Sequence, residues 1–224
     1  AEKSVTVALA TQGETPIRYT LDGTKPDKKS PVYTEPLVLT ESCVLTAMPV
    51  RNNVEPKCYT RKFDFHKAVG KKVTFSREVN TRYAQGGAVN LTDGVRATEV
   101  HKSIDWVSWR GDAVDLVVDM ESTEPYSSVS FGMLSNKSSR IFLPVKLAIA
   151  VSEDGENYTE VAAQEYEIES KDAPDDHITE YSFSFPETSA RYIKVTGTPV
   201  DVLPEWHYNA GARVYIYFDE IIVR

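Results

Sequence analysis

The sequence lacks any long hydrophobic segment. No run reaches the roughly 18 apolar residues of a transmembrane helix, and residues 1–4 have neither the basic start nor the apolar stretch of a signal peptide. We therefore expect no membrane insertion, and a mature chain or an excised piece of a longer one.

The sequence also lacks the short motifs of common active sites. It contains no Gly-x-Ser-x-Gly, His-Glu-x-x-His, P-loop or Gly-x-Gly-x-x-Gly pattern, and its four histidines are scattered. Asp219 and Glu220 are neighbours in a predicted strand, so their side chains point to opposite faces and cannot flank one glycosidic bond. We expect no catalytic residue in this chain.

Cysteine is scarce, with only Cys43 and Cys58. Both lie in a predicted hairpin that turns near residues 51–54, where position 43 should face about 62 and position 58 about 47. That offset is roughly 13 Å, beyond the ~7 Å between Cα atoms that a disulfide can bridge. We expect two free thiols.

The negative charge lies almost entirely in one part of the sequence. Residues 1–66 carry 9 basic and 8 acidic residues, whereas residues 67–224 carry 16 and 25, a net charge of −9. Such a domain repels phosphate backbones and anionic lipids, so we expect no nucleic-acid partner; a cation or a neutral ligand fits the net charge better.

The hydrophobic pattern alternates with a period of two, as in residues 4–9, 17–21 and 145–151, and no segment keeps a helical stripe for three turns. Turn signals such as Asp22-Gly23 separate the apolar runs. The sequence predicts an all-β protein of two sandwich domains, residues 1–66 and residues 67–224, the second an eight-stranded jelly roll.

The first domain carries the run IRYTLDGTKP at residues 17–26 and SPVYTEPLVL at residues 30–39. Read physically, this is a strand, a tight turn and a proline-rich loop. The two runs resemble the small immunoglobulin-like domain at the C-terminus of chitobiase and β-hexosaminidase enzymes. The resemblance covers about residues 4–65 and implies a small immunoglobulin- or fibronectin-like β-sandwich that serves as a scaffold, with no ligand.

The second domain opens with NLTDGVRAT at residues 90–98 and closes with FDEIIV at residues 218–223. A turn with an Asp, free carbonyls and a Thr hydroxyl, joined by a Glu from the last strand, offers the hard oxygen donors that Ca²⁺ prefers. The alternative is a capped Asx turn with a surface Glu.

These runs, with VDLVVDM, PVKLAIAVSEDGENYTEV and ARYIKVTG, resemble a discoidin (coagulation factor 5/8 type C) domain, the fold of family 32 carbohydrate-binding modules. The resemblance implies a structural calcium ion that ties the first loop to the last strand. Its implied ligands are Asn90, Asp93, Val95, Thr98, Asp219 and Glu220.

The stretches IDWVSWRG at residues 104–111 and PEWHYNAG at residues 204–211 are similar to modules of family 20 β-N-acetylhexosaminidases. The two domains in this order therefore imply an accessory region of one such glycoside hydrolase. Its catalytic (β/α)₈ barrel would lie upstream of Ala1 and be a partner within the same polypeptide.

Sugar binding needs an aromatic face for the C–H side of a pyranose and planar donors for its hydroxyls. Four loops carry such residues, and the candidate sugar-binding residues are Trp106, Arg110, Arg140, Trp206, His207 and Tyr208. Structural alternatives remain open: Trp106 or Trp109 plugs one end of the sandwich, and Arg140 is an ordinary solvated charge.

The leading hypothesis is a non-catalytic carbohydrate-binding accessory region of a secreted, extracellular or periplasmic β-N-acetylhexosaminidase-like enzyme. It would bind amino-sugar or galactose-type glycans and be monomeric as a fragment. The alternative is a purely structural spacer, two domains that pack against the catalytic barrel.

Overall fold

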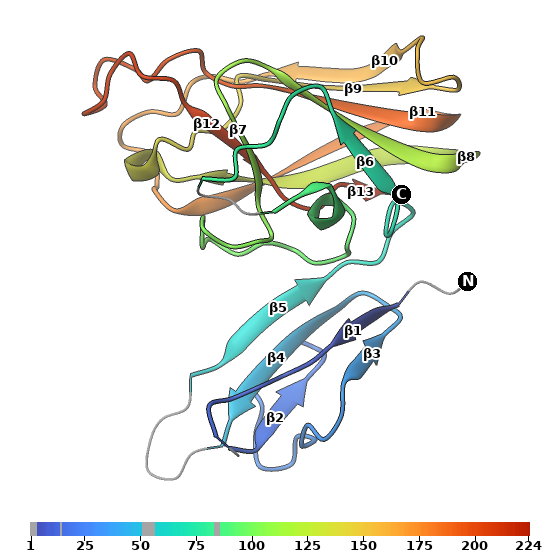
Figure 1. Cartoon of the computed structure of the whole chain (residues 1–224), viewed down its shortest axis with the longest axis vertical. Helices are drawn as coiled ribbons and strands as arrows, with labels where there is room; N and C mark the ends of the chain where they lie inside the picture. The colour runs from blue at the N-terminus through green and yellow to red at the C-terminus, as the bar shows by residue number, and fades with distance from the viewer. Residues whose placement is uncertain (1–3, 14, 51–56, 83–85) are drawn as a thin grey trace. The chain divides into compact units, whose positions relative to one another are not determined.

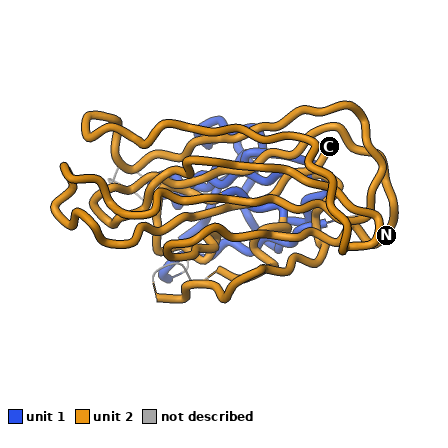
Figure 2. The backbone as a smooth tube through the Cα atoms, turned by 90° about the horizontal axis from the view of Figure 1, so that it is seen from above, with its two compact units in different colours: residues 1–65, 94–96 blue, residues 66–93, 97–224 orange. Residues whose placement is uncertain are grey.

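The computed structural model describes residues 4–13, 15–50, 57–82 and 86–224. The chain divides into two compact units, residues 1–65 with 94–96 and residues 66–93 with 97–224 (Figure 2). The described residues are almost entirely strands and loops, which confirms the predicted all-β class (Figure 1).

The first unit is a small sandwich of two antiparallel sheets. Its strands are β1 Val5–Val7, β2 Ile17–Thr20, β3 Leu37–Leu39, β4 Cys43–Pro49 and β5 Tyr59–Phe63. Strands β1 and β3 form one sheet, and β2, β4 and β5 form the other. Leu39, Leu45 and Phe63 are the buried centre of the core between them. Residues 94–96 belong to this unit, where Val95 forms an antiparallel bridge with Phe63.

The hairpin of β4 and β5 has a register one residue away from the predicted one. Cys43 lies opposite Phe63, and Ala47 lies opposite Tyr59. The predicted turn at residues 51–54 lies outside the described residues. Because Cys58 immediately precedes Tyr59, the two cysteines are offset along the hairpin, and both are free thiols.

The second unit is a jelly-roll sandwich built around two very long strands. Its elements are β6 Lys72–Phe75, η1 Ala88–Leu91, β7 Val107–Arg110, β8 Val114–Ser135, η2 Lys137–Ser139, β9 Lys146–Ser152, β10 Thr159–Glu165, β11 His177–Thr198, β12 Tyr215–Phe218 and β13 Ile222–Val223. The strand order is β10-β9-β11-β8-β12-β7, and β6 and β13 also pair with β8. The predicted jelly-roll fold is confirmed.

Strands β8 and β11 serve both layers because they bend. Their ladder shifts register between Ser184 and Thr188 and again between Ala190 and Tyr192. The first part of β8 pairs with β6, and its last part pairs with β12 and β13. One antiparallel pair thus links the two faces of the sandwich.

Alternation along β8 sets the core of the second unit. Leu116, Val118 and Met120 are completely buried, while the residues between them are half-buried. Gly197 of β11 is needed for packing, since a Cβ there would lie 2.6 Å from Cζ of Phe218. The phenyl ring fills that space and contacts Phe131, with ring centroids 5.3 Å apart.

Candidate functional site

The second unit has a small cavity whose lining comes from three loops and one strand. Its volume is about 230 Å³, just below the roughly 300–1,000 Å³ of sites for drug-sized ligands. The lining residues are His101, Lys102, Ser138, Ser139, Arg140, Tyr208 and Tyr217. A space of this size suits about one sugar ring.

One wall of the cavity is the short helix η2, which Asn136 caps. Its side-chain oxygen accepts hydrogen bonds from the Ser139 amide at 2.7 Å and the Ser138 hydroxyl at 2.9 Å. Arg140 ends η2 with a φ of 63°, in the left-handed region that non-glycine residues rarely adopt. The Asn136 cap and the Arg140 turn together fix this loop.

The loop at residues 204–211 is joined to η2 by hydrogen bonds. Nδ1 of His207 accepts the Asn209 amide at 3.0 Å, so its other nitrogen, Nε2, carries the proton and donates to the Lys137 carbonyl at 2.8 Å. The Tyr208 hydroxyl donates to the Ser138 carbonyl at 2.7 Å. Tyr208 is nevertheless 73% exposed, and its ring lies at the cavity.

His207 is one of the predicted sugar-binding residues, and the structure shows it held by contacts within the protein. The imidazole is buried, and each ring nitrogen already has a main-chain partner. Its ring stacks on Tyr208 with centroids 4.4 Å apart. His207 therefore packs against the ring of Tyr208, and Tyr208 is the exposed residue of this pair.

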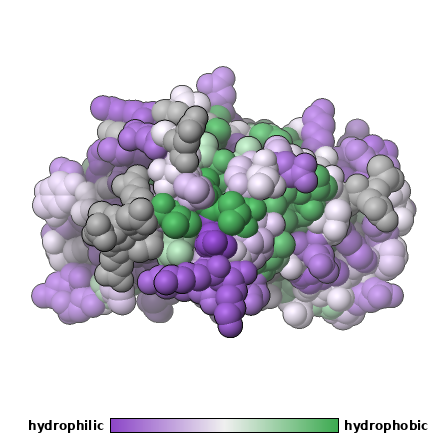
Figure 3. Space-filling model, turned by 90° about the horizontal axis from the view of Figure 1, so that it is seen from below, coloured by the Kyte–Doolittle hydropathy of each residue, from purple (hydrophilic) through white to green (hydrophobic). Residues whose placement is uncertain are grey.

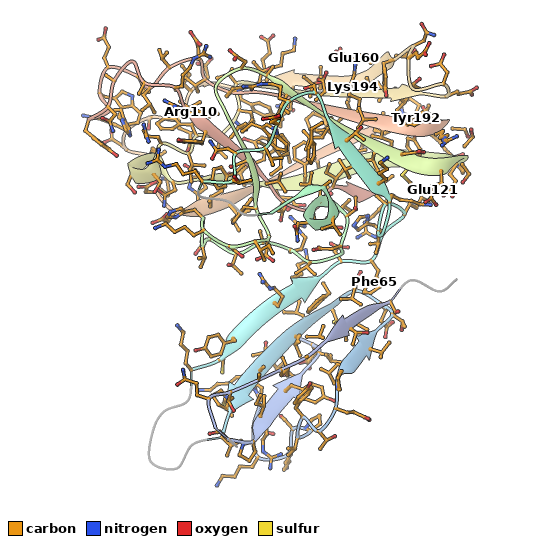
Figure 4. The ribbon with its side chains drawn as sticks, in the orientation of Figure 1. Phe65, Arg110, Glu121, Glu160, Tyr192 and Lys194 are labelled. Carbon is orange, nitrogen blue, oxygen red and sulfur yellow. The ribbon has the colours of Figure 1, made fainter. Side chains whose placement is uncertain are left out.

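Two arginines lie around the buried ring of Tyr215. The guanidinium of Arg140 is 5.5 Å from the ring centroid, and that of Arg110 is 5.8 Å away. Arg110 is exposed at the end of β7, far from Glu121 and Tyr192 at the other end of the unit (Figure 4). Arg140 lines the cavity, whereas Arg110 lies beside it.

Trp106, another of the predicted sugar-binding residues, lies in the interior of the second unit. Its side chain is fully buried, and the indole N–H donates to the Thr98 carbonyl at 2.8 Å. Trp109 is likewise buried, with its ring centroid 5.0 Å from that of Phe75. Both residues fill the interior, which was the structural alternative, because the indole N–H of Trp106 finds a main-chain acceptor.

Trp206 is 40% exposed but is not a lining residue of the cavity. Its ring packs against Phe142, with centroids 5.9 Å apart. The structure thus brings Arg140 and Tyr208 together at the cavity and leaves Trp206 and Arg110 outside it.

Sequence reasoning missed five of the lining residues, which are His101, Lys102, Ser138, Ser139 and Tyr217. Tyr217 lies in β12, where all four residues are buried, so its sequence pattern does not distinguish a cavity-lining tyrosine from a core tyrosine. His101 and Lys102 lie in the loop before the candidate Trp106, and their nitrogen-bearing side chains were the signal available there.

The predicted calcium ligands lie in a second region, where the first loop of this unit meets the connection between β12 and β13. Oε2 of Glu220 accepts the Asp93 amide at 3.1 Å, and Oε1 lies 2.7 Å from Nε2 of His66. The side-chain amide of Asn90 donates through Nδ2 to Oδ2 of Asp93 at 3.2 Å. Asn90, Asp93 and Glu220 are therefore neighbours.

The other predicted ligands are held in different ways. The Asp219 carboxylate accepts the amides of Gly132 at 2.5 Å and Ala97 at 3.3 Å. The Thr98 carbonyl accepts the indole of Trp106. Val95 belongs to the first unit.

The predicted ligand atoms in the second unit suit Ca²⁺, because all of them are oxygens and Ca²⁺ prefers oxygen ligands. No three His, Cys, Asp or Glu side chains in the described ranges form a metal-binding group. A cation held here would therefore take most of its shell from main-chain oxygens, with Asp93 and Glu220 as the carboxylates.

Two family models match the chain. Residues 7–63 match the model described as Fn3 associated, and residues 72–214, more than half of the chain, match the F5/8 type C domain. The chain belongs to the F5/8 type C domain family. The cavity and the Asp93–Glu220 region both lie in the F5/8 type C part or directly at its ends.

Solved structures resemble the F5/8 type C part at low identity. A module from Clostridium perfringens, in complex with GalNAc-β-1,3-galactose, is 16% identical, with a TM-score of 0.44, over 68% of this chain and 94% of its own. Chitosan-binding module 1 from Paenibacillus sp. IK-5 is 17% identical, with a TM-score of 0.46, over 71% and 98%. The lectin domain of lectinolysin, complexed with Lewis B antigen, is 20% identical, with a TM-score of 0.45, over 71% and 96%.

No curated protein matches the chain. Among the residues that the structure describes, no helix is long and apolar enough to cross a membrane.

Proposed function

We propose that the second unit is a non-catalytic carbohydrate-binding module and that the cavity at Arg140 and Tyr208 is its sugar site. The observation that carries this proposal is the combination of an exposed aromatic ring with planar and hydroxyl donors around one small space. An aromatic face packs on the C–H side of a pyranose, while the guanidinium of Arg140 and the hydroxyls of Ser138 and Ser139 hydrogen-bond to its substituents.

The affinity for a single ring should be weak. A shallow site that buries one or two rings gives a Kd of about 0.1–1 mM, equivalent to roughly 4–5.5 kcal/mol. Attachment to a larger enzyme that holds the substrate at a second place would raise the effective affinity.

A glycan array with the whole chain tests this function. We expect selective retention on amino-sugar or galactose-type glycans that is lost in Tyr208→Ala. Tyr59→Ala is the matched control, since it removes an exposed tyrosine from the first unit. If correctly folded protein is retained on no glycan of the array, the proposal is contradicted.

The parent enzyme is a further part of the proposal. The order of an Fn3-associated match and an F5/8 type C match supports an accessory region of a secreted β-N-acetylhexosaminidase-like glycoside hydrolase, extracellular or periplasmic. An antibody against this chain should precipitate such activity from the culture medium or periplasm of the source organism. Precipitation of a polypeptide without glycosidase activity would contradict it.

We also propose a structural calcium ion in the second unit. Asp93 and Glu220 would supply carboxylates, with main-chain oxygens of Asn90, Thr98 and Asp219. The support is the approach of the Asp93 loop to Glu220 at the end of the chain. Bound there, the ion would tie the first loop to the last strand.

A second candidate function, a structural docking role, is favoured by the first unit. Its exposed large apolar side chains are Leu21, Val32, Val38, Val50 and Tyr59. Figure 3 shows apolar side chains gathered in the middle of one face of the molecule, with polar ones around them. An apolar surface of this kind is typical of a contact with another domain, such as a catalytic barrel.

A further inference from the structure

The cavity is basic, although the sequence around it is acidic. Residues 67–224 carry 25 acidic and 16 basic residues. The cavity, however, has Arg140, Lys102 and His101 in its lining and no carboxylate from any described residue. Net charge predicts a cation or a neutral ligand for the whole domain, whereas the local charge at the cavity has the opposite sign.

Two other hollows of the second unit do not have a basic lining of this kind. The hollow on the face of β9, β10 and β11 combines Lys146 and Lys194 with Glu160, and Figure 4 shows Lys194 and Glu160 together on that face. The hollow beside the turn after β9 is lined by Glu153 and Asp154. Of these three hollows, the cavity at Arg140 is the one whose charged lining residues are all basic.

The cations of the cavity also lack the partners that other cations of this unit have. Arg191, Arg213 and Lys71 each form an ion pair with an aspartate or glutamate. Within the described part of the chain, neither Arg140 nor Lys102 has a carboxylate within ion-pair distance. An unpaired guanidinium can give its full set of donors to a ligand anion.

Arg140 is held in place before any ligand arrives. Its amide donates to the Lys137 carbonyl at 2.9 Å, and its carbonyl accepts the Tyr215 amide at 2.9 Å. The guanidinium lies over the ring of Tyr215. The left-handed backbone of this residue costs free energy that glycine would avoid, and a fixed arginine donor beside the cavity gives that cost a use.

We propose that the cavity binds a pyranose that carries a carboxylate or sulfate group, with the anionic group at Arg140 and Lys102 and the ring against Tyr208. This inference rests on the proposed carbohydrate-binding function and names its ligand class. The shared chemistry of the ligands is one sugar ring with one negative charge. Whether that charge is a uronate or a sulfate ester is decided by separate arms of the test.

The test is calorimetric titration of the whole chain with two matched pairs of sugars. One pair is galactose and galacturonic acid, and the other is N-acetylglucosamine and its 6-sulfate. We expect at least one anionic sugar to bind about tenfold or more tightly than its neutral partner, because a charge-assisted bidentate contact is added. High salt should weaken the binding of the anionic sugar more than that of the neutral one.

Three variants make the test specific. Arg140→Gln should lower the affinity for the anionic sugar by more than the affinity for the neutral sugar. Lys102→Gln should do the same to a smaller extent, and it cannot unfold the protein by losing a packed contact, because Lys102 is exposed. Lys72→Gln removes an exposed charge of the same unit outside the cavity and should change neither affinity.

The outcomes separate this inference from the function on which it rests. If the neutral sugars bind as tightly as the anionic ones, the inference fails and the carbohydrate-binding function stands. If inorganic sulfate competes as effectively as the sulfated sugar, the site recognises an anion and not a sugar, which also overturns the inference. If no sugar of either kind binds the folded chain, the proposed function itself fails.

Discussion

The Nε2 atom of His66 lies 2.7 Å from Oε1 of Glu220, and both side chains are fully buried. Nδ1 of His66 accepts the amides of Ala68 at 3.2 Å and Val223 at 3.4 Å, so the ring proton is on Nε2 and is donated to Glu220. This bond joins the first residue of the second unit to its last strands, 154 positions apart. It closes the sandwich at the point where its ends meet.

Replacing His66 with alanine should lower the free energy of unfolding by about 2–4 kcal/mol, because the buried carboxylate of Glu220 loses a donor. Urea unfolding in the presence of a chelator measures this loss separately from any effect of calcium. His101→Ala is the matched control; it removes a partly exposed histidine and should stay within about 0.5 kcal/mol of the wild type. Equal losses in both variants would contradict a special role for His66.

Removal of calcium should lower the melting temperature of the chain. A ligand that binds only the folded state at ~100 times its Kd stabilises it by about 2.7 kcal/mol, or roughly 5–10 °C for a domain of this size. The comparison is a thermal melt with excess calcium against one with chelator. In Asp93→Asn, which removes one proposed carboxylate, the calcium-dependent shift should be much smaller. An unchanged melting temperature of the wild type would remove calcium from the proposal.

The core could be predicted from the sequence better than the site. Alternation places Leu116 and Val118 inside β8 without knowledge of the partner strand, since period two alone decides the face. The exact register of β4 and β5 depends on a turn, so the prediction missed it by one residue.

The cavity depends on contacts that local sequence does not encode. Tyr208 meets Ser138 across 70 positions, and only the fold brings their loops together. For Trp106 the sequence left both sugar binding and burial open, and the structure buries it because a main-chain acceptor at Thr98 satisfies its N–H. Residue type and loop membership therefore identified Arg140 and Tyr208 as candidates but could not separate them from Trp106 and His207.

Trp206 and Tyr208 should respond differently to truncation. Tyr208→Ala removes the exposed ring at the cavity and should weaken sugar binding by about 2–10-fold, the equivalent of roughly 0.5–1.5 kcal/mol of ring stacking. Trp206→Ala should leave the affinity within about twofold. It should instead cost about 1–2 kcal/mol of stability, because the partly buried indole packs on Phe142.

Titration of both variants with the same sugar, together with urea unfolding, checks this pair of expectations. A larger loss of affinity in Trp206→Ala than in Tyr208→Ala would move the sugar site away from the cavity and onto the outer face of the loop at residues 204–211.

Arg191 and Asp119 should make the second unit sensitive to acid. Arg191 lies where the β8–β11 ladder shifts register, between the paired residues Ala190 and Tyr192, and its guanidinium donates to Asp119 at 2.9 and 3.0 Å. This pair, helped by the Glu121 amide, holds the pKa of Asp119 below its usual value. A lowered folded-state pKa gives stability that is present above the unfolded pKa of about 3.9 and is lost as pH falls through the folded pKa.

Asp119→Asn should therefore cost about 0.5–1 kcal/mol near neutral pH, a modest value because Arg191 is 41% exposed and solvent screens the pair. The difference between wild type and variant should shrink as the pH falls below about 4 and disappear once Asp119 is protonated in both states. Urea unfolding over a pH series measures it. Asp172→Asn is the control, since this exposed carboxylate should give no pH-dependent difference. A difference that stays constant through the acid range would mean that the asparagine acts through packing or the ladder irregularity and not through the charge of Asp119.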